Sequence, residues 1–292
     1  MSLRTTGLRR AFAGATLAAA LAALPSPAAR AQDEPARGGS TSGPPLWEAG
    51  VFGGVATQPA YPGADENVDR ALVLPWVVYR GPLLRIDRGA LTVRALRTPR
   101  TELDVGFALS LGSNASDVQA RRGMPDLGTL VEFGPRLKIN LGELDGDRPA
   151  WRLELPLRGV FDAGDGLRHR GYAFEPQLVY ETRRDGGWGL QASAGLVFGD
   201  RELNDTFYGV APAFATASRP AYEARAGLIG SRAGLALSRR VGQDLRLFVF
   251  ARVDSVAGGA NDASPLVRRE TGATAGVGLA WTLARSQRRG SD

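Results

Sequence analysis

The chain has 292 residues and a formal net charge of +6, and it contains 38 glycines, one histidine and no cysteine. Without cysteine it can form no disulfide, thiolate metal site or cysteine nucleophile, and one histidine excludes a site built from several. Beyond the N-terminus no apolar run reaches the roughly 18 residues of a membrane-spanning helix, so helical spans are not expected.

The first 31 residues are predicted to be a secretory signal peptide. A basic start precedes the apolar stretch 11–24, and an A-x-A site follows. The residues that define cleavage are Ala29, Ala31 and Gln32. Removing the segment leaves 32 basic and 30 acidic side chains, and the arginines are spread along the chain, so nucleic acid is not an expected partner. Residues 32–45, rich in Gly, Pro and Ser, are interpreted as a flexible periplasmic leader.

From residue 46 to residue 283 apolar and polar residues alternate with a period of two. In 102–111, for example, Leu103, Val105 and Phe107 share one face, and this pattern predicts strands with one apolar face. The expected segments are 46–57, 70–79, 82–87, 90–96, 102–111, 128–141, 150–161, 172–182, 188–198, 221–240, 245–254 and 271–283.

The length of these segments favours an antiparallel transmembrane β-barrel over a soluble sandwich. Many run for 10–13 residues, close to the number that crosses a bilayer, whereas soluble strands are usually shorter. Aromatic residues also lie at segment ends, as in the girdles of membrane barrels. These are Trp47, Trp151, Phe161, Trp188, Phe198 and Trp281. We therefore predict an all-β barrel over 46–283.

About twelve strands are expected, with fourteen as the alternative. The apolar phase changes near Gly230, which indicates that 221–240 is one bulged strand or a strand preceded by a loop arm. With both ends in the periplasm, the long connections 58–69, 112–127, 162–171, 199–220 and 255–270 all lie outside the cell. Short inner turns and long outer loops are typical of such barrels.

Five short motifs occur in order along this region. In chain order they are Tyr61, Pro62, Gly63; Leu74-Pro75-Trp76 with Tyr79, Arg80, Gly81; Tyr208, Gly209, Val210; Arg219-Pro220-Ala221-Tyr222; and Ser264, Pro265 within 260–267. In order and spacing the sequence resembles the MltA-interacting protein (MipA)/OmpV family of outer-membrane proteins over roughly 46–283.

The resemblance implies a non-enzymatic barrel in the outer membrane of a Gram-negative bacterium. It implies a scaffold for a lytic transglycosylase and a murein synthase, with a narrow pore for small solutes or a surface adhesin as alternatives. Outer-membrane lipid, lipopolysaccharide and the barrel assembly machinery are the other expected partners. Unlike most such barrels, the chain does not end on an aromatic residue, because a tail of residues 284–292 follows Leu283.

No catalytic, cofactor-binding or metal-binding residue is predicted. His169 lies in an expected external loop without a recognisable serine motif beside it. Asp145, Asp147, Asp162 and Asp165 do not have the spacing of a calcium loop. Tyr61-Pro62-Gly63 is interpreted first as a rigid turn, because proline fixes φ and glycine tolerates positive φ, and second as a partner contact.

Overall fold

The computed structural model describes residues 45–80, 84–87, 90–93, 96–98, 100–142 and 150–288. The predicted signal peptide, its cleavage residues Ala29, Ala31 and Gln32, and almost all of the predicted leader lie outside this part of the chain.

The described chain is built mainly from β-strands. The strands are β1 (Trp47–Pro59), β2 (Asn67–Arg80), β3 (Leu84–Asp87), β4 (Ala90–Val93), β5 (Leu96–Arg97), β6 (Thr101–Ser110), β7 (Leu130–Asn140), β8 (Ala150–Asp162), β9 (Arg168–Phe174), β10 (Gln177–Arg184), β11 (Trp188–Gly199), β12 (Gly227–Val241), β13 (Leu245–Ser255) and β14 (Thr271–Arg285). The helical segments are η2 (Ala115–Asp117), η3 (Gln119–Arg121), η4 (Asp185–Gly187), α1 (Arg201–Tyr208) and η5 (Pro212–Phe214).

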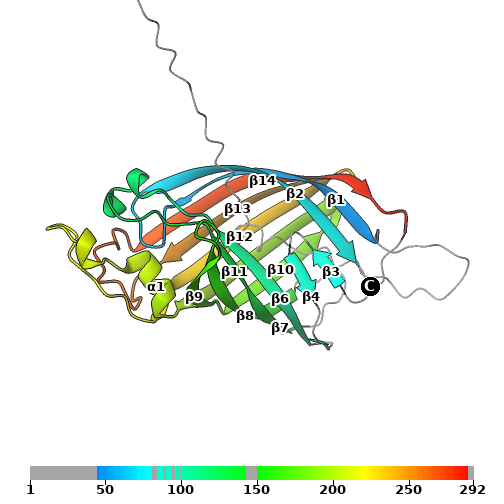
Figure 1. The fold of residues 1–292 in the computed structure, drawn as a ribbon. Coiled ribbons are helices and arrows are strands. Elements are labelled where there is room, and N and C mark those ends of the chain that lie inside the picture. The colour runs from blue at the N-terminus through cyan, green and yellow to red at the C-terminus, as the bar shows by residue number, and fades with distance from the viewer. Residues whose placement is uncertain are drawn as a thin grey trace, which may run out of the picture.

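All the described strands belong to one antiparallel sheet that closes into a barrel (Figure 1). The hydrogen-bonded path runs β4-β3-β2-β1-β14-β13-β12-β11-β10-β8-β7-β6-β5, and β9 pairs with β8 and β11. Because β5 pairs with β6 and β4 lies beside β6, the two ends of the path meet. In the described part of the chain, β4 and β5 share one position in the ring of strands, and β9 and β10 share another. The ring therefore has twelve positions, which confirms the prediction of about twelve strands.

The two irregular strands have identifiable causes. β9 and β10 are separated at Glu175-Pro176, and Pro156 on neighbouring β8 lies opposite this break, where its carbonyl accepts from the Glu175 amide at 3.2 Å. On β12 the register slips by one residue, because Val197 faces Gly230 whereas Phe198 faces Leu228. The phase change expected at Gly230 is therefore a bulge at Ile229, and residues 221–226 form a loop arm that leads into the strand.

The alternating pattern separates a lipid-facing exterior from the interior. On β13, Leu247, Val249 and Val253 are 41%, 54% and 48% exposed, while Phe248 between them is 4% exposed. Exposed tryptophans mark one end of this apolar band, as expected for an interface girdle. They are Trp47, Trp151, Trp188 and Trp281. Among the described helices, none is long and apolar enough to cross a membrane.

The two ends of the barrel are unlike. The connections 60–66, 111–129, 200–226 and 256–270 carry most of the described helical segments and gather at one end (Figure 1). The opposite end has the short turns Asp185–Gly187 and 242–244, and there the Leu46 amide donates to the Arg288 carbonyl at 2.8 Å. By the usual asymmetry of these barrels, the short-turn end faces the periplasm.

Candidate functional site

Inside the barrel, a buried carboxylate is shared by two cations from the neighbouring strand. Both Asp104 carboxylate oxygens accept from Arg136, whose Nε and Nη2 lie at 2.9 and 2.8 Å. Lys138 Nζ lies 2.6 Å from Asp104 Oδ2 and 3.3 Å from Glu102 Oε1. Asp104 is 1% exposed, so its charge depends on these partners, since a buried charge is tolerated only when it is paired.

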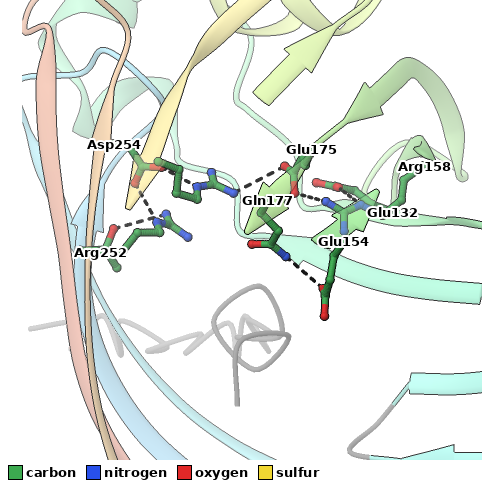
Figure 2. Close-up of polar contacts among 9 residues, drawn as sticks. Glu132, Glu154, Arg158, Glu175, Gln177, Arg252 and Asp254 are labelled. Carbon is green, nitrogen blue, oxygen red and sulfur yellow. Dashed lines mark hydrogen bonds and ion pairs between the residues drawn. The ribbon is translucent and has the colours of Figure 1, made fainter. Parts of the chain in front are cut away.

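A longer chain of alternating charges crosses the lumen wall from β7 to β13 (Figure 2). Its members, in order, are Glu132, Arg158, Glu175, Arg232, Asp254 and Arg252. Arg158 Nε lies 3.0 Å from Glu132 and its Nη2 bonds Glu175. Arg232 lies 3.5 Å from Glu175 and 2.6 Å from Asp254. The chain therefore ties together strands that are not neighbours in the ring.

Glu154 on β8 connects that strand to β10. It accepts from Arg152 Nε at 2.7 Å and from Gln177 Nε2 at 3.2 Å (Figure 2 shows the latter contact). The wall as a whole can hold the barrel's cross-section fixed and present both signs of charge to anything within the lumen.

A second sector of the interior is apolar, which the sequence did not lead us to expect. Phe52 on β1 and Phe248 on β13 stack with ring centroids 5.1 Å apart. They form one buried cluster with Leu72, Leu109 and neighbouring residues. The missed signal is that Phe248 and Phe250 lie on the otherwise polar face of β13.

At the outer end, the long connections pack against one another as a cap. We use "loop cap" for residues 60–66, 111–129, 200–226 and 256–270. Two buried clusters within it combine residues from several of these connections, including Tyr61, Val118, Tyr208, Val210 and Leu266. Tyr61 OH donates to the Leu266 carbonyl at 2.7 Å, and Ser264 Oγ donates to the Tyr208 carbonyl at 2.8 Å.

Two arginines connect loops whose strands are not neighbours in the ring. Arg219 donates through Nη1 to the carbonyls of Ala120 and Arg122, at 2.9 and 3.1 Å. Arg121 donates to the Phe207 carbonyl at 3.3 Å, and its guanidinium lies 5.7 Å from the Tyr61 ring centroid. Since β8 and β9–β10 separate the two connections around the barrel, these contacts reach across its outer mouth.

A buried amide pair fixes α1 within the cap. Asn261 Nδ2 donates to Asn204 Oδ1 at 2.8 Å and to the Arg225 carbonyl at 2.8 Å. Asn204 is fully buried and its own Nδ2 donates to the Gly199 carbonyl at 2.9 Å. Asp200 caps the helix by accepting from the Leu203 amide at 2.9 Å.

Burial changes the acid–base properties of the cap. Burial raises the pKa of Tyr61 to about 12, although the nearby Arg121 acts in the opposite direction. The pKa of Tyr208 is raised as well, again mainly by burial, and burial lowers the pKa of Arg121. Both tyrosines are therefore neutral packing groups at physiological pH.

The cap unites most of the motif residues singled out in the sequence. Tyr61-Pro62-Gly63 forms the expected turn: the Ala64 amide donates to the Tyr61 carbonyl at 3.0 Å, and Gly63 has φ +92°. With proline second and positive φ third, this is a type II turn. Tyr208, Gly209 and Val210 lie in the same cap, where Ser264 Oγ bonds the Tyr208 carbonyl, and Pro265 follows Ser264 in the chain.

The remaining motif residues lie elsewhere. The backbone of Tyr79 and Arg80 belongs to the end of β2, in a strand rather than a loop and far along the barrel from the cap, and Gly81 lies outside the described residues. A role for any of these motif residues stays a prediction.

Residues 51–283 match the MipA family, described as MltA-interacting protein MipA. The chain belongs to the MipA family. The match spans the barrel from β1 to β14 and includes the connections of the loop cap. Together with the lipid-facing band, membership makes this MipA-family chain an outer-membrane β-barrel protein.

Solved structures similar to this MipA-family barrel are distant. The translocator domain of the autotransporter NalP from Neisseria meningitidis is 11% identical, with a TM-score of 0.45, over 82% of this chain and 89% of that one. The NanC porin is 10% identical, with a TM-score of 0.38, over 80% and 100%. Outer membrane phospholipase A from Escherichia coli is 12% identical, with a TM-score of 0.35, over 80% and 92%. No curated protein matches the chain.

The one histidine of this MipA-family chain lies at the outer rim. His169 Nδ1 is 3.4 Å from Glu202 on α1, and its ring contacts Phe161 and Tyr172 edge-on. Within the described ranges, no group of three or more His, Cys, Asp or Glu residues is arranged to hold a metal ion. The polar side chains that the described structure brings together therefore form ion pairs and contacts between loops.

Proposed function

We propose that this MipA-family protein is a non-enzymatic scaffold in the outer membrane, which holds a lytic transglycosylase and a murein synthase at its periplasmic end. The family description, MltA-interacting protein, supports a partner of this kind. The structural observation that carries the proposal is the loop cap, whose arginines connect loops across the outer mouth. A barrel fastened at its outer end is better suited to a fixed anchor than to free passage of solutes.

The surface available for such partners is small, so the contact can be located. Among the described residues, the periplasmic turns that could meet a partner include Asp185–Gly187 and residues 242–244. A photo-crosslinking amino acid at Gln243, in intact cells, is expected to capture a lytic transglycosylase or a murein synthase, identified by mass spectrometry.

The matched control carries the same crosslinker at Ser218, an exposed residue of the loop cap. It is expected to capture neither enzyme, because the cap faces the cell exterior. Recovery of only lipopolysaccharide and assembly factors from Gln243 and from the other periplasmic turns would overturn the scaffold proposal.

A narrow pore is the second candidate, because both signs of charge line the lumen wall. Single-channel recording in planar bilayers separates the two. The scaffold proposal expects no stable conductance from the unaltered protein and more frequent brief openings after Arg219→Ala, which removes the Arg219 contacts between two connections of the cap. Steady conductance of the unaltered protein would favour the pore.

A further inference from the structure

Three side chains form a row across adjacent strands at the periplasmic end of the barrel. In the sheet register Arg184 on β10 lies opposite Trp188 on β11, and Trp188 lies opposite Arg239 on β12. All three are exposed. Each of them lies on the outward face of its strand, together with Leu178 on β10, Leu196 on β11 and Leu237 on β12. These leucines are 38%, 42% and 40% exposed.

Among the described residues, the two arginines of this row have no acidic partner. The Arg239 guanidinium lies over the Trp188 ring, 5.0 Å from its centroid. No ion pair joins Arg184 or Arg239 to a carboxylate in the described part of the chain. By contrast, the inward-facing Arg183 next to them pairs with Glu181 at 2.9 Å. Two exposed cations in one row, one of them over the indole, suit an external anion.

The row lies at the level of the lipid headgroups. Trp188 and Phe198 are the aromatic ends of β11, ten residues apart, or about 34 Å along a strand. At the usual tilt of barrel strands this corresponds to roughly 25 Å across the membrane, the height of the apolar band. Trp188 therefore belongs to the periplasmic girdle, where arginine side chains reach lipid headgroups while their stems stay in the apolar layer.

The surface between the row and the membrane centre suits an acyl chain. On β11 the outward positions beyond Trp188 include the small residues Ala192 and Ala194. On the neighbouring strand Leu235 and Leu237 are 53% and 40% exposed. Small side chains beside larger aliphatic ones leave room for a chain to lie along the strand.

We propose that Arg184, Trp188 and Arg239 bind the phosphate headgroup of an anionic phospholipid in the periplasmic leaflet. The two guanidinium groups donate charge-assisted hydrogen bonds to the phosphate oxygens. The indole holds Arg239 in place by a cation–π contact. The acyl chains lie on β11 and β12.

The test is native mass spectrometry of the full chain in detergent, titrated with phosphatidylglycerol. The double variant R184Q/R239Q is expected to bind it more weakly by roughly fivefold for each arginine removed. W188L is expected to weaken binding by a smaller factor. The matched control R100Q/R288Q removes two other exposed arginines from the same end of the barrel and is expected to bind as the unaltered protein does.

Several results would overturn the proposal. An equal loss in both double variants would mean diffuse attraction to a basic surface, and no loss in R184Q/R239Q would exclude the site. Equal retention of phosphatidylcholine by the unaltered protein would exclude selection of an anionic lipid. Displacement of the lipid by millimolar inorganic phosphate would point to free phosphate as the ligand. Heat-dependent mobility on gels, measured for each variant, confirms that the barrel is folded.

Discussion

Asp104 is the residue on which two lumenal cations depend. Replacing it with alanine leaves Arg136 and Lys138, whose side chains are 18% and 20% exposed, without their shared carboxylate. Removing one partner from a buried ion pair typically costs about 3–5 kcal/mol. We expect Asp104→Ala to lower the free energy of unfolding by that order, measured by tryptophan fluorescence in urea with the barrel in lipid vesicles.

The control for this variant is an ion pair at the surface. Asp165→Ala removes a carboxylate that is 54% exposed and lies 3.2 Å from Arg170. Exposed pairs contribute about 0–1 kcal/mol. Equal effects of the two substitutions would contradict the view that the lumenal pair matters because it is buried.

Tyr61 makes the loop cap sensitive to alkaline pH. Its pKa of about 12 exceeds the ordinary value of 10.0, so the packed cap favours the neutral phenol. Below pH 10 the tyrosine is neutral in both open and closed caps, and no stability is lost. As pH rises from about 10 towards 12, the open form ionises first and the closed cap is progressively destabilised.

Absorbance at 295 nm measures this effect. The unaltered protein is expected to show late-titrating tyrosinate, and Tyr61→Phe is expected to remove one such component. Tyr222→Phe is the control for loss of a partly buried cap tyrosine. An unchanged titration of the late component in Tyr61→Phe would show that this ring is not the one protected.

Among the elements, the connection between β11 and β12 is joined to that between β6 and β7 by Arg219 and Arg121, and Arg219 makes the larger number of these contacts. Arg219 donates to the carbonyls of Phe214, Ala120 and Arg122. Hydrogen bonds from charged groups contribute about 1.5–3 kcal/mol each. Arg219→Ala is therefore expected to speed proteolysis at Arg122 by at least about tenfold while the barrel stays folded.

The comparison variant is Arg225→Ala, in the same connection, whose exposed guanidinium makes one contact, with the Ala260 carbonyl at 3.0 Å. Its cleavage rate is expected to change little. If both variants are cleaved at the same rate, Arg219 is not what holds the two loops together.

The whole barrel depends on how its first and last strands meet. β14 continues beyond Leu283 to Arg285, where Ala284 pairs with Ala49 and Arg285 with Glu48. Truncation after Leu283 removes these pairs, so we expect less assembled protein and a lower melting temperature of heat-dependent gel mobility. Truncation after Arg288 keeps the pairs and serves as the control. The start of the tail after Leu283 thus extends the last strand.

How much of the structure the sequence predicts depends on how far apart in the chain the contacting residues lie. The barrel, its strand count and most of its loop asymmetry follow from alternation along single strands, which is local. The expected long connection 162–171 is wrong, because β8 ends at Asp162 and β9 begins at Arg168, so His169 lies on a strand. The Arg152–Glu154 pair joins residues two apart on one face of β8, so it follows from the same local alternation. Arg158 instead binds Glu132 and Glu175, which lie outside its own strand. Partners across strands depend on register, which alternation alone does not fix.

The contacts within the loop cap are even less predictable from the sequence, for the same reason. Tyr61 and Leu266 are 205 residues apart in sequence, and no pattern along the chain relates them. The apolar content of residues 207–214 is visible in the sequence, but it does not show which residues they contact. Tyr208 and Val210 are buried against the other loops of the cap.

The contact between Gly63 and the last connection has a consequence for the order of folding. The amides of Arg268 and Arg269 both donate to the Gly63 carbonyl, at 2.7 and 3.0 Å. Among the described strands, β1 and β14 are the paired neighbours that lie farthest apart in the chain, whereas most other neighbours are consecutive. Local hairpins can form first and the ring closes last, because long-range pairing carries the largest entropic cost. The two hydrogen bonds to Gly63 then hold the outer end of the β1–β14 junction together. The two strands can separate from that end only after these bonds break.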